Sequence, residues 1–266
     1  MKPSGLSSYF RLPKLTYRVW RVWRRNLDVF MKTYQVNFIP SLLEPLFYLV
    51  GLGLGLGGFV QPQEGLSYIV FIASSLVAIT MMYSSFFECT YASFVRMYFQ
   101  KTFDAIIATP VSLEEVIAGE LMWGATKSLI NSTIVLGVIF AFNLVSSPFA
   151  LLIPPLSFLI GLLFSAIAMC FTAIAPNIDF FNYPSFLFIT PMFILSGTFF
   201  SISVLPTGVQ VIANLFFPLA HAVALTRALA IGRLSVTLLL NLFWFLVTTP
   251  FFFVLAINLM KKRLIK

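Results

Sequence analysis

Two acidic residues interrupt long apolar runs of the chain. Glu44 precedes Pro45 in the first run, and Glu88 lies in the second. A carboxylate inside a membrane span is costly, so it marks either an internal ion pair or hydrogen bond, or a group on a translocation path. The sequence leaves both roles open for each residue. A proton relay is less favoured, because relays use several acids or histidines in series and this chain has one histidine.

Hydrolytic or metal chemistry lacks its usual motifs. His221 has no H-E-x-x-H context, Ser196 lies outside a G-x-S-x-G motif, and Cys89 and Cys170 lack the spacing of metal ligands. A G-x-x-x-x-G-K-[ST] phosphate loop is also absent from the sequence. We therefore predict no catalytic residue, no metal site and no cofactor site in this chain. An intramembrane lipid enzyme built on Ser196 and His221 is a remote alternative.

Composition indicates the class of protein that must position these groups. Hydrophobic residues make up 59% of the 266 residues, charged residues 10%, and the mean hydropathy is +0.96. A soluble domain has about 25% charged residues, so we expect an all-α integral membrane protein. A span needs about 20 apolar residues. The pattern predicts one transmembrane domain over 36–260 with six helices near 36–58, 66–95, 116–143, 150–174, 183–204 and 235–260.

The distribution of Lys and Arg predicts the orientation. All 17 except Arg227 and Arg233 lie before the first span, in segment 96–127, or at the C-terminal end. By the positive-inside rule this side is cytoplasmic. We therefore expect a multi-pass plasma-membrane protein with both termini in the cytoplasm and no signal peptide. The net charge of +8 favours contact with anionic lipids over nucleic acid.

Two segments outside the spans have their own patterns. The basic tail 1–35 mixes Trp and Tyr with arginine, which is typical of an amphipathic helix lying in the membrane interface. Segment 205–232 is apolar but interrupted by Pro206 and Pro218, and we expect a re-entrant helical hairpin entering from the outer face. A seventh span at 209–231 is the alternative, but it would place the basic C-terminal tail 261–266 outside.

A polar island over 96–127 follows the second predicted span and includes the beginning of the third. It contains four of the nine acidic residues, Asp104, Glu114, Glu115 and Glu120. A charged segment of this kind on the cytoplasmic side predicts a docking surface for a soluble partner.

Local signals divide the island into two helices. Ser112 followed by Glu115 forms a capping-box pattern that starts the third span. Thr102 can cap a short helix over about 102–109, and Pro110 prevents its continuation. We expect this helix to lie across the cytoplasmic ends of the second and third spans.

Glycines in the first predicted span have G-x-x-x-G spacing in two overlapping pairs. Gly51 pairs with Gly55, and Gly53 with Gly57. Such pairs let helix backbones approach closely. Packing against another helix of the same subunit and contact with a second copy both remain open.

Four stretches together resemble type-2 ABC exporter permeases of the NodJ-like kind. The island sequence FDAIIATPVSLEEVIAGELMWGATKS, preceded by YASFVRM, resembles their first cytoplasmic loop. EPLFYLVGLGLGLG at 44–57, LSGTFFSISVLP at 195–206 and PLAHAVALTRAL at 218–229 match in the same order. The resemblance covers nearly the whole chain, and several motifs in one order are more specific than any apolar segment alone.

The resemblance implies a non-catalytic exporter subunit that dimerises and pairs with two ATP-binding subunits, on which ATP and Mg would be bound. The short helix would be the coupling helix within segment 96–115, with contacts from Thr102, Phe103, Asp104, Ile107, Thr109 and Pro110. The first and fifth spans, which contain Tyr48, Phe193 and Phe199, would line the dimer interface. We expect these three residues to lie on the path, together with the intramembrane acids Glu44 and Glu88. An amphipathic or lipid-linked substrate, such as an oligosaccharide, a glycolipid or a drug, would suit this path. An ion- or proton-coupled carrier or channel is the alternative function.

Overall fold

The structure is a computed structural model that describes residues 11–265, and the side chains of all these except residues 37, 38 and 40–42. The predicted tail residues 1–10 and residue 266 therefore lie outside the described part. The elements are α1 (Val19–Lys32), α2 (Tyr34–Tyr48), η2 (Leu49–Leu54), α3 (Tyr68–Phe87), η3 (Glu88–Ala92), η4 (Val95–Phe99), α4 (Thr102–Ile107), α5 (Leu113–Ala141), η5 (Pro148–Leu152), α6 (Ile153–Ile174), η6 (Ile178–Phe181), α7 (Asn182–Pro184), η7 (Ser185–Ile189), α8 (Thr190–Leu195), η8 (Ile202–Val204), α9 (Thr207–Phe216), α10 (Pro218–Ile231) and α11 (Thr237–Leu264).

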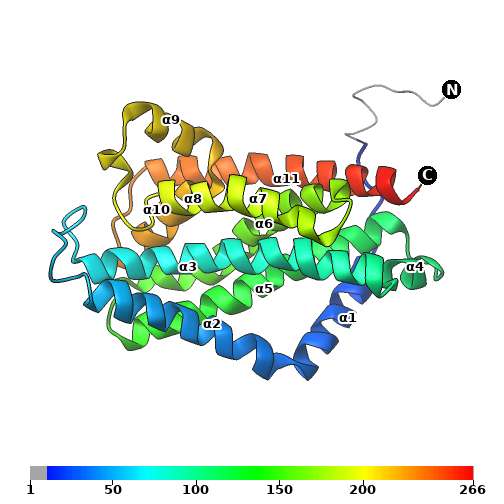
Figure 1. Ribbon diagram of the computed structural model, residues 1–266, viewed down its shortest axis with the longest axis horizontal. Helices are drawn as coiled ribbons and strands as arrows, with labels where there is room; N and C mark the ends of the chain where they lie inside the picture. The colour runs from blue at the N-terminus through cyan, green and yellow to red at the C-terminus, as the bar shows by residue number, and fades with distance from the viewer. Residues whose placement is uncertain (1–10, 266) are drawn as a thin grey trace.

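Five long apolar helices in the described residues confirm an all-helical membrane protein. They are Tyr68–Phe99, Leu113–Ala141, Pro148–Ile174, Ile178–Leu195 and Val236–Leu264. All five correspond to predicted spans. They run roughly along the long axis of the molecule (Figure 1). We call the end with α4 and the C-terminal end of α11 the α4 end, and the opposite end the α9 end.

The first predicted span, 36–58, differs from the other five. A helix is present there as α2 and η2, and the apolar stretch found among its described side chains is Leu43–Leu54. This stretch is shorter than the roughly 20 residues that a spanning helix needs, but the side chains of residues 40–42 directly before it are not described, so the span stays a prediction. In Figure 1 α2 and α1 meet at an elbow on one side of the bundle, and the amphipathic α1 lies between α2 and the α4 end.

The segment predicted as a re-entrant hairpin forms two helices, α9 and α10. They meet at 87°, and Pro218 is the first residue of α10. Proline at this position has no N–H to lose and begins the second helix readily. The break therefore lies at Pro218, one of the two prolines that interrupt this segment. With this bent pair counted as one span, the described residues contain up to six candidate spans.

The core lies between α3, α5, α6, α10 and α11 (Figure 1). Small residues let α5 approach its neighbours closely. A Cβ at Gly124 would lie 2.8 Å from Cys89 Sγ, and a Cβ at Gly161 would lie 2.6 Å from Ser128 Oγ. Helix association in membranes depends on such close packing because lipid removes the hydrophobic driving force.

The N-terminal helix α1 is amphipathic, as predicted. Val19, Val22 and Asn26 are buried, and α1 packs against α5. A Cβ at Gly119 would lie 2.6 Å from Val22 Cβ, so this glycine admits α1 onto α5. Trp20, which is exposed, stacks on Trp23 at 4.0 Å between ring centroids.

Candidate functional site

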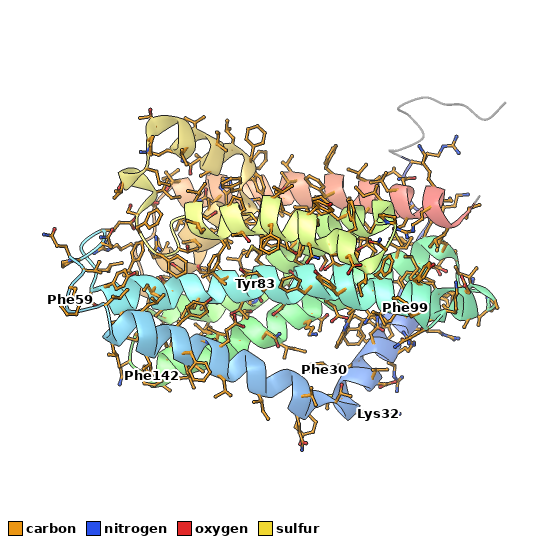
Figure 2. The ribbon with its side chains drawn as sticks, in the orientation of Figure 1. Phe30, Lys32, Phe59, Tyr83, Phe99 and Phe142 are labelled. Carbon is orange, nitrogen blue, oxygen red and sulfur yellow. The ribbon has the colours of Figure 1, made fainter. Side chains whose placement is uncertain are left out.

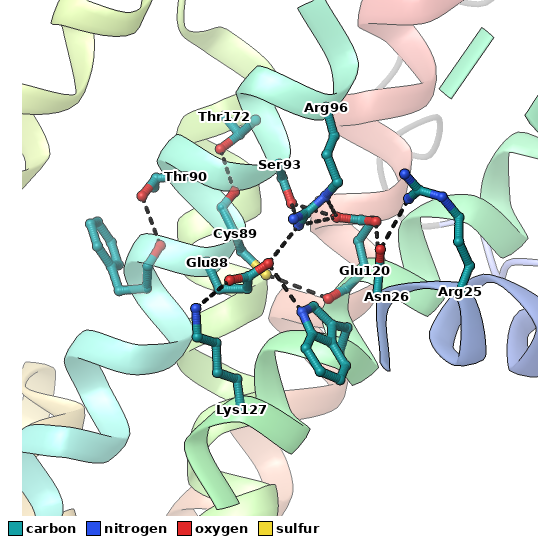
Figure 3. Close-up of polar contacts among 12 residues, drawn as sticks. Arg25, Asn26, Glu88, Cys89, Thr90, Ser93, Arg96, Glu120, Lys127 and Thr172 are labelled. Carbon is teal, nitrogen blue, oxygen red and sulfur yellow. Dashed lines mark hydrogen bonds and ion pairs between the residues drawn. The ribbon is translucent and has the colours of Figure 1, made fainter. Parts of the chain in front are cut away.

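A cluster of charged side chains joins α3, its continuation η3–η4, and α5 near the α4 end (Figure 3). Arg96 Nη2 is 2.6 Å from Glu120 Oε2 and 2.8 Å from Glu88 Oε1. Lys127 Nζ is 2.9 Å from the other oxygen of Glu88. Glu88 is 5% exposed and Glu120 is fully buried. Because a buried charge is tolerated only when it is paired and hydrogen-bonded, these ion pairs replace the water that both carboxylates lose.

Neutral side chains complete the hydrogen bonding of the two carboxylates. Ser93 Oγ donates to Glu120 Oε2 at 2.7 Å, and Asn26 Nδ2 donates to Glu120 Oε1 at 2.8 Å. Trp123 Nε1 donates to Glu88 Oε1 at 3.1 Å. Each of the four carboxylate oxygens therefore has a donor, and Asn26 ties α1 into the cluster.

Arg25 adds a third cation beside this cluster. Its Nη1 donates to Asn26 Oδ1 at 3.1 Å. Burial lowers the pKa of the Arg25 guanidinium, while the nearby Glu120 carboxylate raises it. Since an arginine starts from a pKa above 12, the group stays protonated at neutral pH.

A cavity of about 790 Å³ lies beside the cluster, between α1 and α2 on one side and α3 and α5 on the other. This volume falls within the range of typical ligand pockets, roughly 300–1,000 Å³. Glu44, Tyr48 and Glu88, three of the five predicted path residues, line it. Cations line the same cavity: Arg25, Arg96 and Lys127. Glu88 therefore forms the internal ion pair that was one of its two predicted roles, and it also lies on the wall of this cavity.

Aromatic rings extend from this cavity toward the fifth predicted span. The ring centroids of Tyr48 and Phe199 are 6.5 Å apart, and those of Phe193 and Phe199 are 5.0 Å apart. Tyr83 contacts Phe193 at 5.8 Å and also lines the cavity. Figure 2 shows Tyr83 near the middle of the long axis. The structure thus brings the predicted aromatic residues together, with Tyr48 shared between the rings and the cavity.

The short helix α4 lies at one end of the molecule, between the α3–η4 helix and α5 (Figure 1). It spans Thr102–Ile107, shorter than the predicted 102–109. Its N-cap is Lys101, in the left-handed conformation with φ 53°. The prediction that Thr102 caps the helix was therefore wrong: Thr102 is the first helical residue, so its hydroxyl is past the cap position.

The predicted contact residues of α4 differ in exposure. Phe103 is fully buried and joins the hydrophobic core, and Thr102 is half-buried. Asp104, Ile107, Thr109 and Pro110 are exposed. Phe103 therefore anchors the helix on the bundle, and the other four form the accessible surface.

The capping box at the start of α5 is present as predicted. Glu115 N donates to Ser112 Oγ at 3.3 Å, and Ser112 N donates to Glu115 Oε2 at 2.7 Å. The remaining carboxylate oxygen of Glu115 accepts from Thr16. Glu115 is 2% exposed, so its carboxylate binds donors within the subunit and is not available at the surface.

Glu114 is also satisfied inside the chain. It accepts from the backbone N–H of Lys14 at 2.6 Å and pairs with Lys261 near the C-terminal end of α11. Together with Glu115 and Glu120, three of the four acids of the island have partners within the subunit. Asp104 is the exposed one.

The glycines of the first predicted span have unequal surroundings. A Cβ at Gly53 would lie 2.8 Å from Ile69 Cγ1 of α3, whereas a Cβ at Gly51 would have nothing within 4 Å. At Gly55 and Gly57 the added atom would meet the carbonyl oxygens of the preceding turn. Gly53 therefore mediates packing within the subunit, and Gly51 lies open.

Sequence reasoning missed most of the charged cluster. It considered Glu88 alone and assigned Glu120 to the island, without pairing either with Arg96 or Lys127. One signal was available: residues 120, 123 and 127 recur at i, i+3 and i+7, which places them on one face of a helix. A polar face within an apolar helix indicates internal partners.

Ser196 and His221 do not form a catalytic pair in the structure. Ser196 Oγ is buried and has no hydrogen-bond partner, and His221 Nδ1 contacts Asn241 Oδ1 at 2.8 Å. A nucleophile and its base need to lie within hydrogen-bond reach. This geometry gives the enzyme alternative no support.

Several long apolar helices, a cavity lined by charged side chains and a short helix at one end are typical of a multi-pass membrane protein of the transport class. The profile of the ABC-2 type transporter family matches residues 17–231, and the chain belongs to this family of transporter permeases. It is 35% identical over 256 residues to nodulation protein J of Sinorhizobium fredii, covering 96% of this chain and 97% of the relative.

Two further relatives cover most of the chain. Nodulation protein J of Rhizobium meliloti is 37% identical over 248 residues, 91% of this chain and 92% of the relative. The inner membrane transport permease YadH of Escherichia coli is 21% identical over 194 residues, 73% of this chain and 75% of the relative. These matches confirm the resemblance to NodJ-like permeases that the motifs indicated.

Proposed function

We propose that this chain is the membrane-spanning subunit of an ABC exporter, driven by ATP hydrolysis on separate partner subunits. The observation that carries the proposal is α4, a short helix that is anchored by the buried Phe103 and presents Asp104 and Ile107 outward between two long apolar helices. ATP and Mg would bind to the partner, and this chain would have no catalytic role.

The α4 end would face the cytoplasm. Lys14 and Lys261 meet at Glu114 there, and the positive-inside rule places such basic residues on the cytoplasmic side. The chain would then lie in the bacterial inner membrane with both termini cytoplasmic. Helix α1 would lie in the interface, with Trp20 at the level of lipid headgroups, and the α9–α10 pair would be a re-entrant hairpin on the outer side.

The docking surface for the ATP-binding subunit would consist of Asp104, Ile107, Thr109 and Pro110. It combines one carboxylate with apolar and neutral groups, and Thr102 borders it. Phe103 would position α4 rather than touch the partner, because its ring lies in the core. Two ATP-binding subunits would serve two copies of this chain.

The path for the substrate would run along the 790 Å³ cavity and the aromatic rings beside it. Glu44, Glu88 and the neighbouring cations would meet polar parts of a cargo, and Tyr48, Phe193 and Phe199 would meet apolar parts. This division suits an amphipathic or lipid-linked substrate, such as an oligosaccharide, a glycolipid or a drug.

A second copy would complete the path. Large side chains on α2 and η2 are more than half exposed, among them Phe47 and Leu54. Phe186 and Leu187 on η7 are exposed in the same way. Gly51, which is open in a single subunit, would allow close approach of the second copy.

The test is co-purification of the chain with an ATP-binding subunit encoded beside it, followed by transport in proteoliposomes. The double variant Asp104→Arg, Ile107→Arg should abolish ATPase stimulation and ATP-dependent transport while membrane insertion is retained. Asp28→Arg, the same substitution as at Asp104 but at an exposed residue of α1, should leave both unchanged. Undiminished ATP-driven transport in the double variant would refute the docking surface, and transport driven by a proton gradient without ATP would favour a carrier.

A further inference from the structure

A second, smaller cavity of about 260 Å³ lies near the α9 end, where loop 61–66, α10 and the start of α11 meet. The function proposed above does not use it. Its polar lining includes Glu64, Ser196, Arg227, Arg233 and Asn241. Most of the remaining wall is apolar side chain from α10 and α11. The cavity is below the size of typical drug sites, so its occupant would be a small group.

Buried donors in this lining have no acceptor. Ser196 is fully buried and its hydroxyl has no hydrogen-bond partner; Arg227 Nε, on a side chain 11% exposed, has none either. A buried donor without an acceptor costs about 1–3 kcal/mol, and such groups are rare in folded proteins. Two of them at one cavity indicate that an acceptor is bound there when the protein functions.

Other contacts hold the Arg227 guanidinium in a fixed position. Nη2 donates to Ser75 Oγ and to the carbonyl of Gly197, both at 2.7 Å, and the group lies over the Phe71 ring at 3.7 Å. Arginine in such a fixed orientation is well suited to binding the oxygens of a phosphate or carboxylate. The site is therefore preorganised for an anion.

The charges around the cavity do not cancel. Arg233 at the mouth donates from Nη1 to the backbone oxygen of Glu64 at 2.7 Å. This hydrogen bond does not involve the Glu64 carboxylate. The Glu64 carboxylate is 3.7 Å from Arg227 and accepts from Ser201 Oγ at 2.7 Å. The cavity lining thus contains one carboxylate and two guanidinium groups.

Asn241 adds a further donor. Its amide oxygen contacts His221 Nδ1 at 2.8 Å, which leaves the amide NH₂ group available. The donors come from the chain before α9, from α10, from the α10–α11 connection and from α11. An acceptor with several oxygens pointing in different directions can satisfy more of them than a planar carboxylate can.

We propose that this cavity binds a phosphate group, held by Arg227, Arg233 and Ser196. The group belongs either to a phospholipid headgroup of the adjoining leaflet or to free phosphate. Its binding would join loop 61–66 to α10 and α11 and so stabilise the α9 end of the subunit.

The experiment uses the full chain purified in a phosphate-free, lipid-depleted detergent. Binding of ³³P-labelled inorganic phosphate is measured by equilibrium dialysis, and binding of a short-chain phosphatidylglycerol is measured by native mass spectrometry. Saturable binding of either probe supports the site, and the probe that binds identifies the source of the phosphate. Saturable binding of neither probe overturns the proposal.

Two variants test the residues. Ser196→Ala and Arg233→Gln should each weaken binding by about tenfold or more, which corresponds to about 1.4 kcal/mol. Ser196→Ala should leave the fold intact, because the hydroxyl makes no hydrogen bond in the protein. Thr249→Ala, which removes another buried unpaired hydroxyl away from the cavity, and Arg24→Gln, which removes an exposed charge on α1, are the matched controls.

The outcomes are distinct. Loss of binding in both site variants with wild-type binding in both controls supports the proposal. Equal binding in the wild type and the two site variants overturns it, since the phosphate would then bind elsewhere.

Discussion

Replacing Arg96 by methionine should destabilise the subunit strongly. Arg96 pairs with two carboxylates, of which Glu120 is fully buried and Glu88 is 5% exposed. After the change Glu88 keeps Lys127 at 2.9 Å, but Glu120 keeps only neutral donors. Removing one partner of a buried ion pair costs about 3–5 kcal/mol, because a charge is left uncompensated. We therefore expect the free energy of unfolding to fall by about 3–5 kcal/mol.

A second substitution isolates the cause. Adding Glu120→Gln to Arg96→Met removes the uncompensated charge, and the glutamine side chain has nearly the same shape as glutamate. About 1–3 kcal/mol of the free energy of unfolding should therefore be regained. Arg24→Met is the matched control. Arg24 is exposed on α1, and its replacement should change the free energy of unfolding by less than about 0.5 kcal/mol.

The assay is equilibrium unfolding of the purified chain in mixed micelles with increasing sodium dodecyl sulfate. Tryptophan fluorescence is a suitable signal, since Trp123 donates to Glu88 within the cluster. A loss below about 1 kcal/mol in Arg96→Met would show that the cluster is solvated and not a buried network. No recovery in the double variant would show that lost packing, and not the charge on Glu120, causes the instability.

Two further changes probe α4 and α2 by the same unfolding assay. Phe103→Ala should lower the free energy of unfolding by about 3–5 kcal/mol, because the ring is fully buried. Ile107→Ala, at a side chain 39% exposed, should lower it by under about 1 kcal/mol. Equal losses would contradict the anchor role of Phe103. Gly53→Ala should lower the free energy of unfolding by about 1–3 kcal/mol, because the added methyl group must displace Ile69. Gly51→Ala, with open space around it, should stabilise a single subunit by up to about 1 kcal/mol. The reverse order would contradict the packing of η2 on α3.

Local signals predicted local structure well. The capping box of Ser112 and Glu115 depends on residues three apart and forms as expected. The break at Pro218 depends on one residue and begins α10. Five spans followed from apolar length alone. These features need no knowledge of how distant segments meet.

The C-terminal end of the first predicted span shows where apolar length was misleading. The prediction of 36–58 counted the glycine-rich stretch after Leu54 as part of the span. The structure has helix up to Leu54, followed by turns. Glycine adds little hydrophobicity and favours turns, so a run that looks continuous in composition ends early as a helix.

The charged cluster could not be derived from the sequence in the same way. Arg96 and Glu120 are 24 residues apart and meet only because α3 and α5 are packed side by side. Glu88 and Lys127 are 39 residues apart and depend on the same packing. Helical spacing could have placed Glu120 and Lys127 on one face, but the choice of facing helix is a tertiary property.

The acids of the polar island also show why charge was a poor guide to which residues lie on the exposed surface. A carboxylate near the end of an apolar helix is expensive to leave unpaired. Such groups therefore take donors within the subunit, as Glu114, Glu115 and Glu120 do. Among the described residues of the island, only the acid without such internal partners stays exposed. On α4 this residue is Asp104, which has exposed apolar and neutral neighbours. Since an isolated surface charge contributes about 0–1 kcal/mol, a partner that binds α4 would gain most of its affinity from apolar contact with Ile107 and Pro110, and Asp104 would mainly set the orientation.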